Sequence, residues 1–222
     1  MRFKLLRMPF PWSRRDPEPI EKINIAGQKI VLREKRISDA PDDYGWRVDE
    51  ELATLDATRP LTMPYEDFLR YSTEEIDFPS PRSKRLGIDT KTHGKHIGNC
   101  MYYDIDLRRS EAELGIMIGD REYWSRGYGT DTVNTLLGHI FSTTTIGRIY
   151  LHTLEWNARA RKSFAKSGFK ELRLIRRGNL DFVQMEIFRN QWEQIVDAAI
   201  RETLRDFDAQ SCEQTSDDDI CK

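Results

Sequence analysis

One short segment constrains the fold of this chain more than any other: Trp124-Ser125-Arg126-Gly127-Tyr128-Gly129-Thr130. The stretch before it, 112–119, alternates apolar and other residues as a half-buried strand does. Apolar residues after it recur at the spacing of an amphipathic helix: Val133, Leu136, Leu137, Ile140 and Phe141. A helix N-terminus offers unpaired N–H groups and a partial positive charge, and glycines let backbone approach an anion closely. The pattern therefore predicts a diphosphate-binding turn with N–H donors from Arg126 through Thr130 and added charge from Arg126.

Two other phosphate motifs fit this turn poorly. The Walker loop ends in Gly-Lys-Ser/Thr, but Gly129 is followed by Thr130-Asp131. The dinucleotide fingerprint needs a third glycine three residues after the second, and position 132 is Thr. Alone, a G-x-G pair fits a tight strand-to-helix turn equally well, so the order of elements around it matters.

The remaining periodicities predict one mixed α/β domain. Strands are expected at 29–33, 85–89, 96–103, 112–119, 148–154, 171–176 and 182–188. Helices are expected at 39–56, 65–76, after the glycine turn, and at 157–166. The 222 residues divide into a flexible basic arm (1–20), the domain (21–189), an amphipathic helix (190–207) and an acidic disordered tail (208–222).

Composition excludes several classes of function. The formal net charge of −2 gives no reason to expect nucleic-acid binding. No apolar run approaches the roughly 18 to 20 residues that span a bilayer, and residues 1–15 lack the features of a secretory signal. The three cysteines show no metal-ligand spacing, so no metal is expected. A cytoplasmic protein with reduced thiols is the prediction.

Four stretches together resemble the GNAT superfamily of acetyl-CoA-dependent N-acetyltransferases, and most closely its RimJ/RimL-like (ribosomal-protein-alanine acetyltransferase-like) branch. They are 30–33 with 38–40 (Ile-Val-Leu-Arg, Ser-Asp-Ala), 112–116 (Ala-Glu-Leu-Gly-Ile), 122–130 and 157–169. The resemblance covers roughly residues 24–189. It implies an acyl-CoA N-acyltransferase fold, with a mostly antiparallel sheet of six to seven strands, about four flanking helices and a C-terminal helix. It also implies direct acetyl transfer from acetyl-CoA to a primary amine on a protein N-terminus or a small molecule.

The resemblance implies that pantetheine runs between two splayed strands, 112–119 and 148–154. The implied cofactor-binding residues are Met117, Ile118, Ser125, Arg126, Gly127, Tyr128, Gly129, Thr130 and Asn157. Asn157 equally suits a helix N-cap. Glu113 is the implied general base, although a solvent-facing strand position explains it as well.

One position departs from the family pattern. Phe164 stands where many members carry a tyrosine that protonates the departing thiolate. Either another group or water supplies that proton, or the chain is a catalytically weak acyl-CoA-binding sensor. Neighbouring Ser163 points elsewhere on a helix. His152 either titrates near neutrality or, as is more common, is simply a strand residue.

Two surface features complete the sequence-based predictions. The acidic patch Asp49-Glu50-Glu51 with Asp56 would attract a cationic amine, or else is a solvated helix face. The apolar stripe from Trp192 to Leu204 must be covered, by its own domain or across the two-fold axis of a homodimer.

Overall fold

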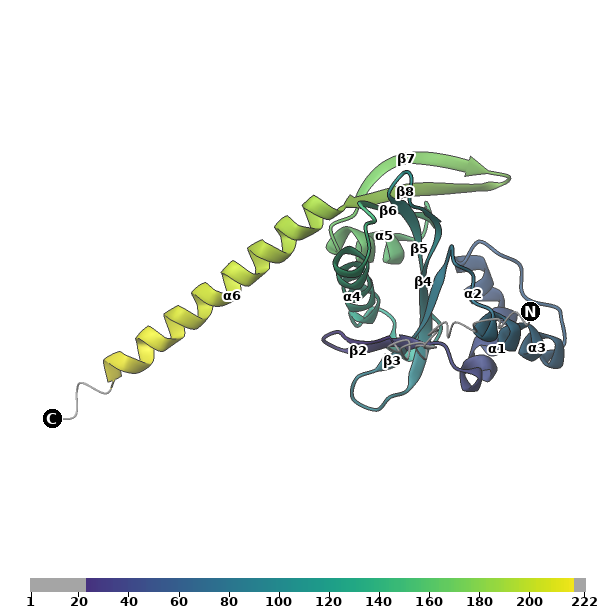
Figure 1. Ribbon diagram of the computed structural model, residues 1–222, viewed down its shortest axis with the longest axis horizontal. Helices are drawn as coiled ribbons and strands as arrows, with labels where there is room; N and C mark the ends of the chain where they lie inside the picture. Colours follow the sequence, from purple (N-terminus) through teal and green to yellow (C-terminus); the bar gives the residue numbers. More distant parts are fainter. Residues whose placement is uncertain (1–22, 218–222) are drawn as a thin grey trace, which may run out of the picture.

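The computed structural model describes the backbone of residues 23–217 and the side chains of residues 23–205 (Figure 1). The predicted basic arm, 1–20, lies outside these residues. The described part contains one sheet in the order β1-β2-β3-β4-β5-β6-β8-β7. The strands are β1 Asn24–Ala26, β2 Ile30–Glu34, β3 Lys84–Thr90, β4 His96–Asp106, β5 Glu111–Ile118, β6 Arg148–Leu154, β7 Lys170–Arg177 and β8 Leu180–Phe188. The predicted mixed, mostly antiparallel fold is confirmed, because β5–β6 is the one parallel pair among the described strands.

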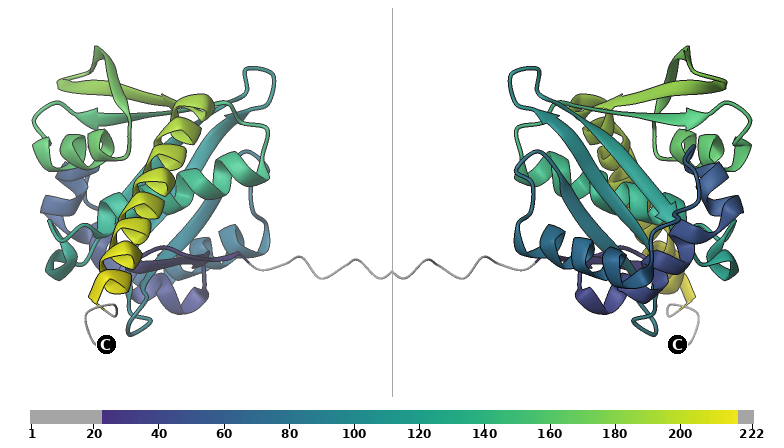
Figure 2. Two further views of the ribbon diagram at one scale, coloured as in Figure 1. Left: turned by 90° about the vertical axis from the view of Figure 1, so that its left-hand side faces the viewer. Right: turned by 90° about the vertical axis from the view of Figure 1, so that its right-hand side faces the viewer.

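The helices form two groups on opposite sides of the sheet (Figures 1 and 2). The first group is α1 Ala40–Val48, α2 Glu50–Leu55 and α3 Tyr65–Asp77; the others are α4 Tyr128–Thr143, α5 Ala158–Lys166 and α6 Arg189–Asp217. The core lies mainly between α4 and the sheet, where Leu136, Leu137 and Ile140 are fully buried against Ile30 and Leu86.

Within the described residues, the structure has eight strands and six α-helices, more than the sequence predicts. The added strand is β1, which pairs only three residues with β2. The added helix arises because the segment predicted as one helix, 39–56, breaks at Asp49. Asp49 has extended backbone, and its carboxylate accepts a hydrogen bond from Leu52 N at 2.9 Å, as an N-cap of α2.

A buried ion cluster ties the start of α1 to the sheet, and two of its members, Arg33 and Asp39, belong to the first of the four stretches that resemble the family. The Arg33 guanidinium donates to the Asp39 carboxylate at 2.8 Å from both Nη atoms. It also donates to Asp89 on β3, at 2.6 Å from Nε and 2.7 Å from Nη2. All three residues are buried. The cluster fixes where the chain leaves β2 and enters the first helical group.

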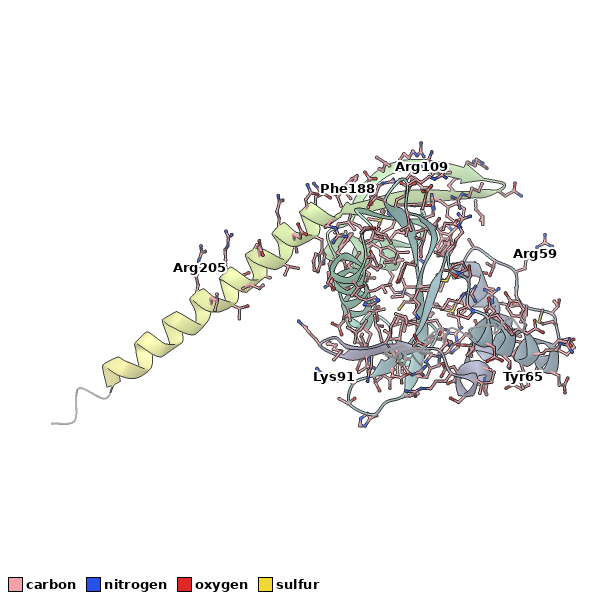
Figure 3. All side chains as sticks on the ribbon, in the orientation of Figure 1. Arg59, Tyr65, Lys91, Arg109, Phe188 and Arg205 are labelled. Carbon is pink, nitrogen blue, oxygen red and sulfur yellow. The ribbon has the colours of Figure 1, made fainter. Side chains whose placement is uncertain are left out.

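The C-terminal helix α6 is longer than expected and docks only at its start. Trp192 packs on Phe141 with ring centroids 5.6 Å apart, whereas Ile195, Ile200 and Leu204 are exposed. Arg205 lies on the part of the helix that projects from the domain (Figure 3). The helix continues to Asp217 instead of giving way to a disordered tail at 208, because no glycine or proline between 190 and 217 ends it. Residues 218–222 lie outside the described part.

A buried hydroxyl in α4 makes a stability prediction. Thr132 Oγ1 is buried and has no hydrogen-bond partner among the described residues. We expect Thr132→Val to raise the free energy of unfolding by about 1 kcal/mol, because valine has nearly the same shape and removes an unsatisfied polar group. Thr135→Val is the matched control, because Thr135 Oγ1 donates to Asp131 O at 2.8 Å and its loss is expected to be neutral or destabilising. Urea unfolding of both variants tests this, and a destabilised Thr132→Val would contradict it.

Candidate active site

Strands β5 and β6 pair only at their beginnings. Glu111, Ala112 and Glu113 face 148–150, and the two strands then diverge with no further pairing. The predicted splay between 112–119 and 148–154 is therefore present. A parallel pair that opens in this way leaves the inner backbone groups of both strands without a ladder partner.

The β4–β5 register identifies which backbone groups face that opening. Gly119 N donates to Ile97 O at 2.9 Å, which fixes the alternation of the ladder. By that alternation, the backbone of Met117 bonds to β4, while the backbones of Ile116 and Ile118 point toward the opening. Ile116, which the sequence did not single out, thus takes the position expected for Met117.

Helix α4 begins at the opening, with Gly127 as its N-cap. Gly127 has φ of 86°, and the first helical hydrogen bond runs from Asp131 N to Gly127 O at 3.0 Å. The backbone amides from Ser125 to Thr130 make no hydrogen bond within the described part of the chain. A row of unpaired N–H groups with the positive end of a sixteen-residue helix is suited to an anion.

Contacts from the β1–β2 turn hold this N-terminus in place. The Asp131 carboxylate accepts hydrogen bonds from the amides of Gln28, Lys29 and Ile30 at 3.0, 2.7 and 3.1 Å. Lys29 Nζ donates to Arg126 O at 2.8 Å. The turn is thus braced by residues about one hundred positions earlier in the sequence, which no local pattern could reveal.

A large cleft of about 1440 Å³ runs from the α4 N-terminus along the opening to the first helical group. Its lining includes most of the predicted cofactor residues: Met117, Ile118, Ser125, Gly127, Gly129, Thr130 and Asn157. Arg126 and Tyr128 are not among the lining residues. Tyr128 packs against Tyr123 instead, with ring centroids 4.9 Å apart. Ligand sites commonly occupy about 300–1,000 Å³, so the cleft has room for a large ligand and a second one.

The cleft-lining residues at the start of α5 and within it make different kinds of contact. Asn157 Oδ1 accepts a hydrogen bond from Ala160 N at 3.1 Å, so the N-cap role is confirmed, and its Nδ2 has no partner in the described part. Phe164 is buried and packs on Phe169. Ser163 Oγ lies 3.0 Å from Thr130 Oγ1, at the glycine turn (residues 124–130) rather than beside Glu113.

Glu113 belongs to a polar network that the sequence did not predict. His152 Nδ1 lies 2.8 Å from Glu113 Oε1, and His152 Nε2 lies 3.1 Å from Arg177 Nη2. Arginine only donates, so Nε2 accepts and Nδ1 carries the proton that is donated to Glu113. Tyr103 on β4 also hydrogen-bonds Glu113. All four side chains line the cleft. The interpretation of His152 as an ordinary strand residue is therefore incomplete.

The network keeps Glu113 ionised. Burial alone would raise the pKa of this carboxyl, but hydrogen bonds from His152 and Tyr103 outweigh it, and the pKa is lowered. For Tyr103, burial and the negative charge of Glu113 both raise the pKa. Glu113 is thus a carboxylate with fixed orientation, and Tyr103 keeps its proton at neutral pH.

The predicted acidic patch is largely neutralised. Arg121 lies 2.7 Å from Asp49 and 2.8 Å from Glu51, and Arg47 lies 3.1 Å from Asp56. Of the patch residues, Asp56 lines the cleft. No cluster of three or more metal-ligating side chains occurs in the described part of the chain, and none of its helices is long and apolar enough to cross a membrane.

Comparisons with known proteins agree with this geometry. The human alpha/beta-tubulin-N-acetyltransferase 9 is 23% identical over 159 residues, covering 67% of this chain and 75% of that protein. An uncharacterized N-acetyltransferase, p20, of Bacillus licheniformis is 26% identical over 95 residues, covering 43% of this chain and 53% of that protein. The fold matches the spermidine N-acetyltransferase from Vibrio cholerae in complex with CoA and spermine (TM-score 0.66, 18% identity, 74% of this chain and 98% of that one). It also matches an aminoglycoside acetyltransferase in complex with coenzyme A (TM-score 0.62, 16% identity, 74% and 98%).

A family model described as an acetyltransferase (GNAT) domain matches residues 29–170, the part that contains the glycine turn, the splayed strands and Glu113. The chain therefore belongs to the GNAT family of acetyltransferases.

Proposed function

We propose that this acyltransferase uses acetyl-CoA and moves the acetyl group directly to a primary amine on a protein N-terminus or a small molecule. We also propose that it belongs to the RimJ/RimL-like branch. One observation carries the proposal: the unpaired amides at the N-terminus of α4 and the Glu113 carboxylate line the same cleft, at the opening between β5 and β6. Such a site binds an anionic cofactor at one end and accepts a proton further along.

The cofactor would be held by backbone as much as by side chains. The amides from Ser125 to Thr130 would bind the diphosphate, and the Ile116 C=O and the Ile118 N–H, which face the opening, would pair with the pantetheine amides. Trp124 Nε1 donates to Ile118 O at 2.6 Å, which leaves the N–H of Ile118 for a ligand. Asn157 Nδ2 supplies a further donor on the opposite wall.

Glu113 would accept the proton that the attacking amine loses, directly or through one water. An alkyl amine is mostly protonated near neutral pH because its pKa is about 10.4. Its nitrogen forms the new C–N bond as the C–S bond breaks, and the Ile116 N–H, which faces the opening closer to Glu113 along β5, would stabilise the negative charge that develops on the thioester oxygen. Phe164 cannot donate, so the departing thiolate takes its proton from solvent or from a hydroxyl in the cleft.

Phe164 also favours a second candidate, a sensor that binds acyl-CoA with little turnover. Two measurements on the full chain separate the candidates: calorimetry with coenzyme A, and thiol release from acetyl-CoA across a panel of primary amines. Binding with turnover supports the enzyme, and binding without turnover on any amine supports the sensor. Absence of binding would overturn both.

A glycine substitution tests whether the glycine turn binds the diphosphate. We expect Gly127→Ala to weaken coenzyme A binding about tenfold, because a Cβ at φ of 86° costs about 1–2 kcal/mol and moves the amides. The added Cβ would have room, since its nearest neighbour, Lys29 Nζ, lies at 3.5 Å. The effect therefore arises from backbone strain, and calorimetry measures it.

Gly94→Ala is the matched control for that substitution. Gly94 also has positive φ, 64°, with open space around it, but it lies in the β3–β4 turn and does not line the cleft. Both variants should lose similar stability, and only Gly127→Ala should lose affinity. Equal coenzyme A affinities in the two variants would argue against the turn as the diphosphate site.

A further inference from the structure

The cleft extends well beyond the residues assigned to the cofactor. We define its acceptor half as the lining residues between Glu34 and Arg85, which come from the first helical group and the segments around it. Its large apolar members are Trp46, Leu52, Leu55, Leu61, Met63, Phe68, Tyr71, Ile76 and Phe78. These side chains lead from the surface toward the end of β5, where Trp46 packs directly on Gly119.

Several of these apolar side chains face solvent. Phe78 is 82% exposed and Tyr71 51% exposed, and Met63 and Ile76 are exposed as well. Helix α3, which carries two of them, has no buried residue. Single exposed apolar side chains are normal, but four within sixteen residues at the mouth of one cleft form a patch that a ligand can cover.

The carboxylates in the acceptor half are already neutralised. The described lining contains four, and each has a cationic partner: Glu34–Lys84 at 2.7 Å, Asp43–Lys35 at 2.6 Å, Asp56–Arg47 at 3.1 Å and Glu75–Arg85 at 2.6 Å. Arg36 adds a fifth cation to this half. A polycationic acceptor would have to displace these partners or enter beside them, and both cost free energy.

From this lining we infer that the acceptor is a primary amine carried on an apolar group, with no second cation, and that Tyr71, Ile76 and Phe78 contact that group. The inference rests on the proposed function and names its substrate class. The neighbour solved with spermine has 18% sequence identity with this chain, so its likeness shows the fold alone.

A matched pair of acceptors tests the inference. Hexylamine and 1,6-diaminohexane present the same reacting amine on the same six-carbon chain, and the diamine alone carries a second, positively charged ammonium group at the far end. We expect kcat/KM to be at least about tenfold higher for hexylamine, after correction for the two amines of the diamine, because the far end enters an apolar and cation-rich half. Thiol release from acetyl-CoA by the full chain is the measurement.

Two substitutions locate the effect. Phe78→Ala should lower kcat/KM for hexylamine about tenfold while leaving coenzyme A affinity unchanged, since a covered phenyl ring contributes on this scale. The matched control is Leu107→Ala, at a 71% exposed side chain in the β4–β5 turn outside the cleft, which should change neither quantity. Arg85→Gln should raise use of the diamine relative to hexylamine, because it exposes the Glu75 carboxylate.

The outcomes separate this inference from the proposed function. A preference for hexylamine that Phe78→Ala removes supports the inference. Equal use of the two amines, or a preference for the diamine, overturns it while acetyl transfer stands. If neither amine nor any other in the panel releases thiol although coenzyme A binds, the proposed enzyme and the inference fall together and the sensor remains.

Discussion

Replacing Arg33 by methionine is expected to lower the free energy of unfolding by about 3–5 kcal/mol. The substitution keeps a long apolar stem but leaves Asp39 and Asp89 buried without their main counter-charge. Removing one partner of a buried ion cluster strands the others in a poorly solvated site, which costs more than the pairs contribute. Urea or thermal unfolding measures the change.

An exposed pair provides the control for Arg33. Arg70 and Asp67 form an ion pair of 2.8 Å on the surface of α3, and Arg70→Met should change stability by about 0.5 kcal/mol or less. If Arg33→Met proves too unstable to purify, Arg33→Lys keeps the positive charge but loses the planar guanidinium that bonds to both carboxylates. We expect an intermediate loss of stability for this variant. A loss no larger than that of Arg70→Met would contradict a structural role for the cluster.

The difference in the free energy of unfolding between the wild type and Arg33→Met should depend on pH, which provides an independent check. Burial alone would raise the pKa of Asp39, but hydrogen bonds from Arg33 and from the Arg36 amide lower it to about 2 from 3.8. A lowered folded-state pKa stabilises the protein above pH 3.8, and that stabilisation is lost as the pH falls toward 2. The wild type therefore loses stability in this range, and its advantage over Arg33→Met should shrink.

The local parts of the fold and site could be predicted from sequence. The glycine turn, the strand before it and the helix after it form from neighbouring residues. Their apolar periodicity, and the glycine at 127 that the positive φ requires, can therefore be read from the sequence itself. The spacing of Arg33 and Asp39 is likewise local, and the structure explains it as an ion pair six residues apart. Asp49 shows the limit: as an N-cap it splits a segment that polar composition alone predicts as one helix.

Contacts between distant strands could not be predicted in this way. His152 and Glu113 are 39 residues apart, and they meet because β5 and β6 are parallel neighbours that begin in register. Lys29, in the β1–β2 hairpin, supports the glycine turn by a hydrogen bond to Arg126 O, 97 residues later in the sequence. In the sequence, His152 and Lys29 look like ordinary strand or surface residues, and only the sheet order gives them a role. The length of α6 was also underestimated, because low apolar content argues against packing but not against a helix.

The Glu113 carboxylate gives the second large effect, on turnover rather than on stability. Glu113→Gln is expected to lower kcat/KM for acetyl transfer about 10²- to 10³-fold, in line with the loss of a positioned proton acceptor. Glutamine keeps the size of the side chain, so coenzyme A affinity should not change. We expect the wild-type rate to decline at acidic pH as the Glu113 carboxylate becomes protonated, and we expect Glu113→Gln to lack this decline.

The control for Glu113 lies on the same strand. Glu111 is two residues earlier on β5 and is paired with Arg148 at 2.5 Å, but it does not line the cleft, so Glu111→Gln should retain wild-type kcat/KM.

His152→Asn tests the hydrogen-bond partner of Glu113, because the asparagine amide can still donate to Glu113 and should preserve more activity than His152→Ala. If His152 positions Glu113, we expect His152→Asn to be more active than His152→Ala. We also expect the acidic limb of the pH–rate profile to shift, because loss of His152 changes the hydrogen bonding that sets the Glu113 pKa. Equal activity of Glu113→Gln and the wild type would instead mean that the proton leaves through solvent alone, and Glu113 would be a structural residue of the opening.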